Sequence, residues 1–356
     1  MIGNISKAVF IALCLWPSTA VPQGFAGLGS AADGFAIPQR GTAFDFPTDH
    51  GPHPEYRIEW WYLTANLRDA MGHEYGVQWT LFRSALSPET RQGWQSSHLW
   101  MGHAGLTTAD HHFSAERLAR GGIGQAGAHP APFEAWIDDW TMATLAEDGA
   151  DMLTALHVTA QGQTFAYDLT MAATGPIIFH GDAGYSVKSA DGQASYYYSQ
   201  PFYQAQGTLT LPSGSVAVTG TAWLDREWSS QPLSETQDGW DWFSLRFDDG
   251  TRLMAFGLRG HDQATFTAAT WITPDGVTEH YPDGALRLTP LTCAQVADRT
   301  VPVRWRVDLP ARGLSVETEP INPHSWMDVS IPYWEGPFQF SGSHTGVGYL
   351  EMTGYE

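Results

Sequence analysis

The stretch AWLDREWSSQ, residues 222–231, places three charged side chains between two tryptophans. The stretch from residue 215 to 228 otherwise has the β-branched and aromatic residues of a half-buried β-strand. Successive side chains on a strand point to opposite faces, so Trp223, Asp225 and Glu227 share one face and the residues between them share the other. Two carboxyl groups therefore lie beside an indole ring on a single face.

Aromatic and β-branched runs of the same kind recur along the chain. A strand at 215–228 precedes a hairpin at 240–260, whose turn lies at 248–250. Other strands are expected at 58–67, 74–83, 98–109, 265–273, 285–290, 303–310, 313–320, 333–342 and 346–355, with a further hairpin within 151–173. Residues 194–211 are expected to connect the two halves, and residues 113–122 to form a helix of about two turns. Strands that recur about every ten residues predict an all-β antiparallel barrel or sandwich.

The first 45 residues differ from the rest of the chain. Residues 1–20 have the pattern of a secretory signal peptide, with Lys7 before an apolar core and small residues at 18–20. Residues 21–45 are rich in Gly and Ala without periodicity, which predicts an extended arm. We therefore expect a periplasmic or secreted protein with no transmembrane segment in the mature chain. Cys293 is then the sole remaining thiol, and we expect it to be a small buried apolar residue.

The chain is strongly acidic, with a formal net charge of -20 at pH 7. Such a surface repels phosphate backbones and anionic lipid headgroups. This composition argues against a nucleic-acid partner and against electrostatic docking to a membrane.

Two motifs with known chemistry are rejected. GIGQAG, residues 122–127, matches the dinucleotide-binding fingerprint, but the AHPAP that follows cannot begin the helix that this fingerprint requires. The histidine pairs 98/103 and 111/112 do not have the spacing of metal ligands. The sequence therefore predicts no cofactor and no metal.

Four aromatic segments carry embedded carboxyl groups, namely Glu59, Asp225 with Glu227, Asp241 and Glu335. Acids among large aromatic side chains must be paired, hydrated or raised in pKa, because a dry unpaired charge is costly. Two interpretations follow from the residues alone. Arginines 57, 226 and 246 could pair with these acids in structural networks, or some of the acids could be catalytic.

Six motifs together resemble a known family: EWWYLTANL, ASYYYSQPF, GTAWLDREWSSQ, GWDWFSLRFDDGTRLMAFGLR, YWEGP and GYLEMTGY. In order and spacing they resemble the carotenoid 1,2-hydratase (hydroxyneurosporene synthase) superfamily, specifically its exported AttH-like branch. The resemblance runs from about residue 46 to the C-terminus. It implies two tandem lipocalin-like barrels, at 46–205 and 206–356, of which the second carries WLDREW.

The resemblance also implies a chemistry. The superfamily's best-described reaction adds water to a terminal double bond of an acyclic carotenoid without a cofactor. Protonation of an alkene needs a neutral acid in an apolar site, and aromatic faces attract the resulting cation. Asp225 is the expected acid, and Glu227 its tuner or the base for water. The expected ligand-binding residues are Glu59, Trp61, Tyr196, Trp223, Trp242 and Glu335.

Two segments depart from the carotenoid-hydrating members. Just after Asp225, where they are expected to have an asparagine-bearing segment, this chain has Arg226, Glu227 and Trp228. Where they are expected to have a His-x-Trp pair, this chain has Tyr196 and Tyr198, and Tyr198 is the third catalytic candidate. Two hypotheses therefore stand. The protein is a hydratase-like enzyme for an apolar isoprenoid or acyl ligand, or it is a non-catalytic periplasmic lipid carrier or an accessory protein of an ABC exporter permease.

Overall fold

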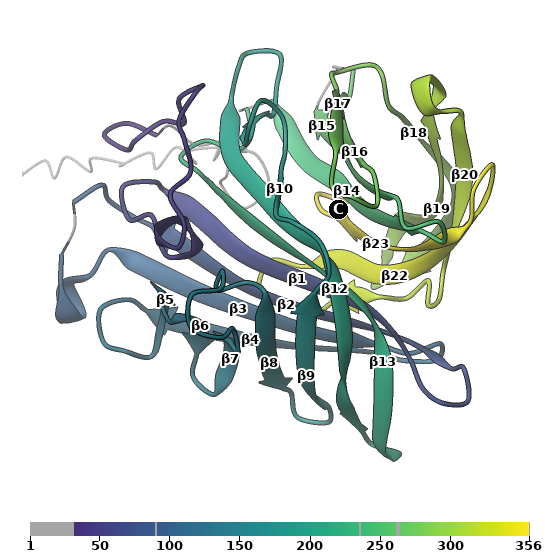
Figure 1. Cartoon of the computed structure of the whole chain (residues 1–356), viewed down its shortest axis with the longest axis horizontal. Helices are drawn as coiled ribbons and strands as arrows, with labels where there is room; N and C mark the ends of the chain where they lie inside the picture. Colours follow the sequence, from purple (N-terminus) through teal and green to yellow (C-terminus); the bar gives the residue numbers. More distant parts are fainter. Residues whose placement is uncertain (1–31, 90, 235, 261–263, 356) are drawn as a thin grey trace, which may run out of the picture.

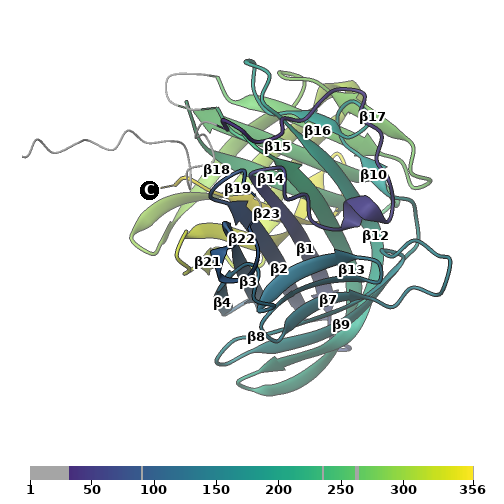
Figure 2. The same ribbon diagram turned by 90° about the vertical axis from the view of Figure 1, so that its left-hand side faces the viewer.

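The computed structural model describes residues 32–89, 91–234, 236–260 and 264–355, and these residues form two curled antiparallel sheets. Figure 1 shows the first sheet at the lower left and the second, green to yellow, at the upper right. The view in Figure 2 shows how strongly the strands curl. The expected all-β class with two tandem lipocalin-like barrels is confirmed. The predicted signal peptide at 1–20 lies outside the described residues, as does the arm up to residue 31.

The first sheet has the strand order β4-β3-β2-β1-β13-β12-β9-β8-β7-β6-β5, with β10 and β11 paired to β12. Its strands are β1 (Ile58–Arg68), β2 (Glu74–Ala85), β3 (His98–Thr107), β4 (His112–Arg120), β5 (Ala126–Pro130), β6 (Phe133–Ile137), β7 (Trp140–Thr144), β8 (Ala155–Gln161), β9 (Ala166–Ala173), β10 (Ile178–Phe179), β11 (Tyr185–Val187), β12 (Ala194–Leu211) and β13 (Gly214–Ser229).

The second sheet has the order β17-β16-β15-β14-β23-β22-β20-β19-β18, with β21 paired to β22. Its strands are β14 (Gln237–Phe247), β15 (Arg252–Gly260), β16 (Phe266–Ile272), β17 (Thr278–Tyr281), β18 (Arg287–Val296), β19 (Arg299–Leu309), β20 (Leu314–Pro320), β21 (Trp326–Met327), β22 (Tyr333–Gly342) and β23 (Gly346–Met352). Short 3-10 helices lie at Thr48–His50, Gly93–Gln95 and Pro310–Arg312.

The WLDREW segment lies in the first sheet, not in the second barrel where the sequence places it. It forms the end of β13, which pairs with β1 on one side and β12 on the other. Residues 194–211 are likewise strand β12 and not a connection between halves. The reason is that β12 and β13 form one long hairpin, which brings the chain back to the first sheet beyond the expected boundary at residue 205.

The helix expected at residues 113–122 is also wrong, because these residues form most of β4. The strand pairs with β3 from Leu99↔Arg120 to Thr107↔His112. Pairing satisfies backbone groups along the whole length of β3, whereas an isolated helix of about two turns is marginal in water. Tertiary pairing therefore overrides the local capping signal.

The expectation that Cys293 is buried is wrong as well, because its side chain is exposed. It lies on β18, the last strand of the second sheet, and most residues of β18 are exposed or half-buried. A strand with a neighbour on one side buries little of its surface.

Three apolar clusters hold the fold together. One fills the first sheet and includes Trp61 and Trp79, and a second fills the second sheet. The third lies between the two sheets and joins Tyr62 and Trp223 of the first to Trp242 of the second. The sheets are therefore packed against each other through large aromatic side chains.

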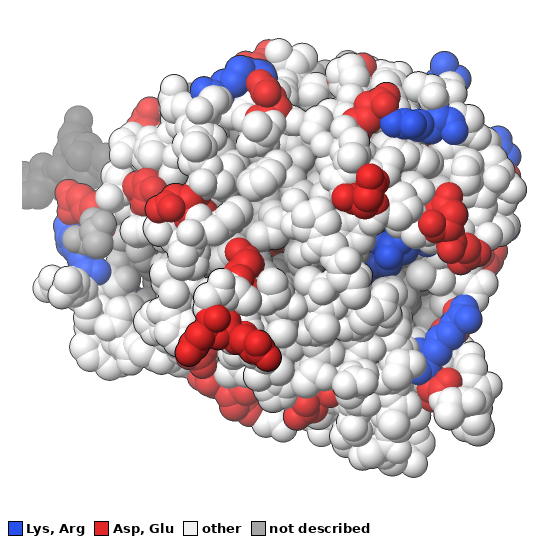
Figure 3. Space-filling model, in the orientation of Figure 1, with Lys and Arg blue, Asp and Glu red and all other residues white. Residues whose placement is uncertain are grey.

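The surface agrees with the acidic composition. Figure 3 shows Asp and Glu spread over the whole visible face, with fewer Lys and Arg between them. Among the described residues, no helix is long and apolar enough to cross a membrane.

Candidate active site

A cavity of about 290 Å³ lies where the two sheets face each other. Its walls are mostly aromatic and aliphatic, with Trp60 and Tyr62 from β1, and Trp242, Phe256 and Leu258 from the second sheet. The lining also includes Leu86, of which 70% is exposed, so the cavity opens to solvent on that side. An apolar enclosure of this kind with a few polar groups is typical of a small-molecule site.

Asp225 lies on the wall of this cavity and is 2% exposed. Tyr197 donates a hydrogen bond to its Oδ2 at 2.8 Å, and the indole Nε1 of Trp223 donates to its Oδ1 at 2.6 Å. The hydroxyl of Ser199 donates to the same Oδ1. Among the ion pairs of the described residues, none joins Asp225 to a lysine or arginine. Its carboxyl group is therefore held by neutral donors alone.

Burial raises the pKa of Asp225 from 3.8 to about 7. The hydrogen bonds from Ser199, Trp223 and Tyr197 oppose this rise, and the negative charge of Glu227 adds to it. Desolvation is the largest effect, because no lysine or arginine among the described residues forms an ion pair with Asp225 to offset it. Asp225 is thus poised to hold a proton near neutral pH, as a general acid requires.

Glu227 lies on the same wall, as the alternation of β13 predicts. Unlike Asp225 it has a cationic partner, because Lys188 Nζ lies 2.7 Å from its Oε1. Both side chains are less than a tenth exposed. Ser195 donates a second hydrogen bond to the same oxygen. The two carboxyl groups on this face therefore have different surroundings, one neutral and one ion-paired.

A second pair of acids comes from the other sheet. Glu351 on β23 lines the cavity, and Trp240 donates a hydrogen bond to it at 2.7 Å. Burial raises its pKa to about 7. Its register partner Glu335 on β22 is fully buried and accepts a hydrogen bond from the hydroxyl of Tyr62. Burial and the nearby Glu351 raise the pKa of Glu335 well above its usual range.

Asp241, on β14, belongs to a different group of contacts. Its carboxylate pairs with Arg259 Nε at 3.0 Å and accepts a hydrogen bond from Tyr355 at 2.9 Å. It is not among the residues that line the cavity. Burial raises its pKa to about 6, against the effect of Arg259. This acid therefore fits the structural interpretation of the embedded carboxyl groups.

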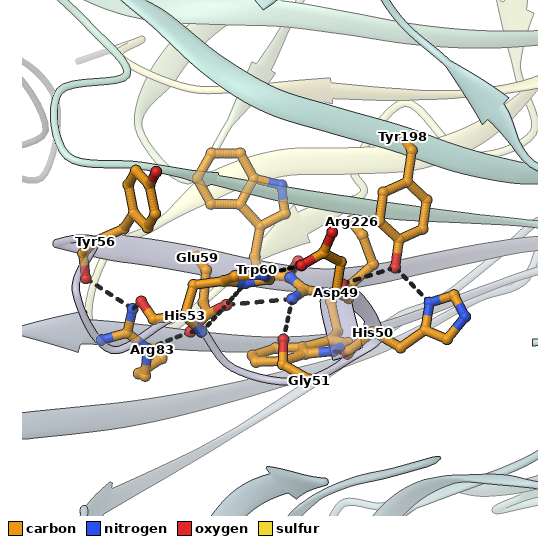
Figure 4. A network of polar contacts seen from close by, with 11 residues as sticks. Asp49, His50, Gly51, His53, Tyr56, Glu59, Trp60, Arg83, Tyr198 and Arg226 are labelled. Carbon is orange, nitrogen blue, oxygen red and sulfur yellow. Dashed lines mark hydrogen bonds and ion pairs between the residues drawn. The ribbon is translucent and has the colours of Figure 1, made fainter. Parts of the chain in front are cut away.

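Glu59 and Trp61 lie on the opposite face of β1, away from the cavity. Glu59 is fully buried and forms ion pairs with Arg83 and, at 3.2 Å, with Arg226. His53 Nδ1 lies 3.1 Å from the same carboxylate (Figure 4). Burial would raise the pKa of Glu59, but these three partners hold it well below its usual range. The structure therefore does not bring Glu59 to Asp225, and it gives Glu59 structural partners.

Tyr198 and Tyr196 also face the first sheet's own core instead of the cavity. The hydroxyl of Tyr198 lies 2.8 Å from His50 Nδ1 (Figure 4), and Tyr196 contacts Gln39 and Thr42 of the N-terminal arm. Both rings belong to the apolar cluster that fills the first sheet. The structure thus separates these two tyrosines from Asp225.

Tyr197, which lies between them in sequence, takes the position beside the acid. It lines the cavity and donates to Asp225, while its own hydroxyl accepts a hydrogen bond from Trp242 at 3.0 Å. Of the residues predicted to bind ligand, Trp223 contacts Asp225 directly and Trp242 contacts it through Tyr197. Glu335 does not line the cavity itself, but it contacts the cavity residue Tyr62.

The sequence model of the AttH-like family matches residues 37–355, which is most of the chain. The chain belongs to the AttH-like family. Its fold is similar to the crystal structure of an AttH protein, NE1406, from Nitrosomonas europaea, with 30% identity and a TM-score of 0.80. That similarity covers 90% of this chain and 100% of the other.

Two more distant structures share the fold of this AttH-like chain. Kievitone hydratase from Nectria haematococca is 16% identical with a TM-score of 0.67, covering 91% of this chain and 98% of its own. CghA, crystallised with Sch210972, is 13% identical with a TM-score of 0.57, covering 92% and 97%. No curated protein matches the chain.

Four polar residues in or beside the cavity of this AttH-like protein are missing from the sequence-based set. Tyr197 and Ser199 contact Asp225, Lys188 pairs with Glu227, and Glu351 lines the opposite wall. Two signals in the sequence point to them. Lys188 is the sole lysine after the predicted signal peptide, and Glu351 is an acid within the aromatic segment GYLEMTGY.

Within the described residues, no three His, Cys, Asp or Glu side chains converge as a set that could hold a metal ion. The cavity instead combines an aspartate with a raised pKa, an ion-paired carboxylate and aromatic faces. This set can protonate an apolar ligand, attract a positively charged intermediate and accept a proton.

Proposed function

We propose that this AttH-like protein binds an apolar isoprenoid or acyl ligand between its two sheets and adds water across a C=C bond. The observation that carries this proposal is Asp225, which lines an apolar cavity, has neutral hydrogen-bond donors and has its pKa raised to about 7. A carboxylic acid kept neutral near pH 7 can donate a proton to a weakly basic alkene.

The proposed reaction runs in two steps. Asp225 transfers its proton to one alkene carbon, and the π-electron pair forms the new C–H bond, which leaves a carbocation on the other carbon and a carboxylate on Asp225. Trp60, Tyr62 and Trp242 line the cavity and present aromatic side chains to this cation. Water then attacks the cation, and Glu227 accepts the proton that water releases. The product is an alcohol that contains one added water. Glu227 then releases its proton to solvent as the product leaves, and Asp225 takes up a proton, so both acids return to their starting forms.

Two further points support the proposal. A hydratase is among the proteins that share this fold, and its similarity to this chain lies in the fold. The signal-like sequence at 1–20 supports export to the periplasm or beyond. An exported enzyme of this kind would meet apolar substrates at or near a membrane.

A non-catalytic carrier, or an accessory protein of an ABC exporter, is the second candidate. The observation that favours it is the mainly apolar lining, which would hold a lipid without any reaction. Asp225 already accepts three hydrogen bonds from the protein, which orient it even if it transfers no proton.

The test is to incubate the purified protein with farnesol, an acyclic isoprenoid alcohol, and to analyse the products by mass spectrometry. We expect a product heavier by one water molecule. The Asp225→Asn variant should bind farnesol like the wild type but convert it on the order of a hundredfold more slowly, or not at all. The matched control is Asp110→Asn, an exposed aspartate that should leave turnover unchanged.

The two candidates give different results. Binding without conversion by both wild type and Asp225→Asn would support the carrier and overturn the enzyme. Conversion at an equal rate by both would remove Asp225 from the mechanism. Mass spectrometry of apolar molecules that co-purify with the exported protein would then identify the natural ligand class.

A further inference from the structure

A chain of hydrogen bonds leads from Asp225 away from the cavity. Ser199 Oγ contacts Asp225 Oδ1, and His180 Nε2 lies 2.6 Å from the same hydroxyl. On the other side of its ring, His180 Nδ1 lies 3.0 Å from Thr270 Oγ1. Thr270 Oγ1 in turn lies 3.1 Å from His280 Nδ1. The links are continuous from the acid to His280.

Strand pairing fixes the two ends of this chain. Ser199 on β12 is the register partner of Asp225 on β13, and Thr270 on β16 is the register partner of His280 on β17. His180 directly follows β10, which pairs with β12, and it bridges the first sheet to the second. A path that starts in one sheet therefore ends on the other.

The interior of the chain is dry and its far end is exposed. Ser199 and His180 are fully buried and Thr270 is 1% exposed, whereas His280 is exposed on the surface. Water can therefore exchange protons with His280, while the three inner groups meet protein atoms.

Every link can both donate and accept a proton. Hydroxyl groups do so by rotation, and a neutral imidazole has one donor and one acceptor nitrogen. Burial, with smaller effects from His280 and Lys188, holds the pKa of His180 well below its usual value, so its resting form is neutral. The Tyr197 ring packs against His180, with ring centroids 4.3 Å apart. At the outer end, burial lowers the pKa of His280 and the negative charge of Asp182 opposes this effect.

We propose that Ser199, His180, Thr270 and His280 form a proton path by which Asp225 exchanges its proton with solvent. Its use in turnover rests on the proposed function, because an acid that protonates an alkene must recover its proton before the next cycle. A bound apolar ligand would leave room in the cavity for the reacting water but would exclude bulk water, so a route through the protein would let Asp225 recover its proton while the cavity is occupied.

Each transfer along the path conserves protons. His280, protonated by water, gives the proton on Nδ1 to Thr270 Oγ1 as the threonine hydroxyl gives its own proton to His180 Nδ1. His180 Nε2–H then gives a proton to Ser199 Oγ as the serine hydroxyl gives its own to the Asp225 carboxylate. His280 and His180 end neutral, and hydroxyl rotation with a tautomer change of His180 restores the starting arrangement.

The same contacts would also exist if they merely satisfied buried polar groups. The two roles differ in the rate of proton exchange at Asp225, which infrared spectroscopy of its protonated C=O stretch can follow after transfer of the full-chain protein from H₂O to D₂O. Asp225→Asn identifies the band, since it removes this carboxyl group. The measurement is made with and without farnesol.

Thr270→Val removes the central hydroxyl at nearly constant shape and lies away from the cavity lining. We expect it to slow the exchange at Asp225 by about tenfold or more. Thr270→Ser, which keeps a hydroxyl, should restore the wild-type rate. Thr278→Val, the same substitution at a half-buried position on β17 outside the path, is the matched control and should exchange like the wild type.

An equal exchange rate in wild type and Thr270→Val, with and without farnesol, would overturn the path whatever the activity. A slow Thr270→Ser variant would overturn it too, since the effect would then come from packing. If Thr270→Val slows exchange but no variant converts farnesol, the path stands and the hydration proposal fails. If the wild type converts farnesol and proton return to Asp225 limits that conversion, Thr270→Val should lower the conversion rate together with the exchange rate.

Discussion

Two buried acids on neighbouring strands show how surroundings set the charge of a carboxyl group. Glu59 on β1 and Asp225 on β13 are both shielded from solvent, yet the pKa of Glu59 is lowered and that of Asp225 is raised. The difference lies in their partners, because Glu59 contacts two guanidinium groups and Asp225 contacts hydroxyls and an indole. Desolvation acts on both, and nearby cations decide the outcome.

Asp225 should therefore make stability depend on pH. The unfolded chain releases this proton near pH 3.8 and the folded chain near 7, so the folded state binds more protons between these values. Stability should fall as pH rises through this window and level off above it. A pKa difference of this size corresponds to about 4 kcal/mol. Asp225→Asn removes the titration, so the free energy of unfolding of the variant relative to wild type should rise by about that amount from pH 4 to pH 8.

Denaturant unfolding of both proteins at several pH values measures this difference. Titrating groups far from Asp225 contribute equally to wild type and variant and cancel in the subtraction, whereas Glu227 and Glu351, which interact with Asp225, add a smaller change of their own. A difference between the two proteins that stays constant with pH would mean that Asp225 is ionised in the folded protein throughout, which removes the basis for its role as an acid.

At the scale of elements, the β12–β13 hairpin explains which site residues the sequence could predict. Alternation along β13 correctly places Asp225 and Glu227 on one face. Their neighbours on β12 depend on register, and the register shifts between Gln200 and Tyr203. The bulge contains Pro201, which cannot donate a ladder hydrogen bond.

Without this bulge, the register near the turn would place Tyr198 and Tyr196 on the same face as Asp225. The extra residue reverses the faces, so that Ser195, Tyr197 and Ser199 point to the cavity side instead. One residue in a strand thus decides which tyrosine meets the acid. A single sequence does not reveal a bulge, and contacts to distant strands, such as Lys188 with Glu227, depend on the complete topology.

The two faces of β1 have different roles, because Trp60 and Tyr62 line the cavity whereas Glu59 points to the opposite side. The second prediction concerns Glu59. Glu59→Gln leaves Arg83 and Arg226 buried without their carboxylate. We expect a loss of about 3–5 kcal/mol in the free energy of unfolding, because an uncompensated buried charge is costly. The affinity of the folded variant for farnesol should not change, since Glu59 faces away from the cavity.

The control for this change is Glu89→Gln, whose exposed pair with Arg91 should contribute less than about 1 kcal/mol. Urea unfolding gives the stabilities, and calorimetric titration below the unfolding transition gives the affinities. A stable Glu59→Gln protein that has lost farnesol binding would reverse the assignment and make Glu59 a ligand residue, as the sequence predicts.

For the whole molecule, the tandem arrangement creates a site that neither sheet could form alone. The interior of each sheet is packed with its own apolar cluster, including Trp61 in the first and Trp334 in the second. The cavity lies between the sheets, with Asp225 on one wall and Glu351 on the other. The tandem arrangement therefore provides an interface whose walls carry the acids.

This geometry predicts that a larger side chain on the second sheet can block ligand binding while Asp225 and its hydrogen-bond partners stay unchanged. Leu258 on β15 lines the cavity and is 6% exposed, so Leu258→Trp should fill part of its volume. We expect the affinity for farnesol to fall about tenfold or more, equivalent to about 1.4 kcal/mol. The free energy of unfolding should change by no more than about 1–3 kcal/mol, because the added ring enters space that is already open.

Leu118→Trp, at an exposed site on β4, is the matched control for the added indole. Calorimetric titration that finds both variants binding like wild type would place the ligand outside the space between the sheets, and the acids there would then have no substrate.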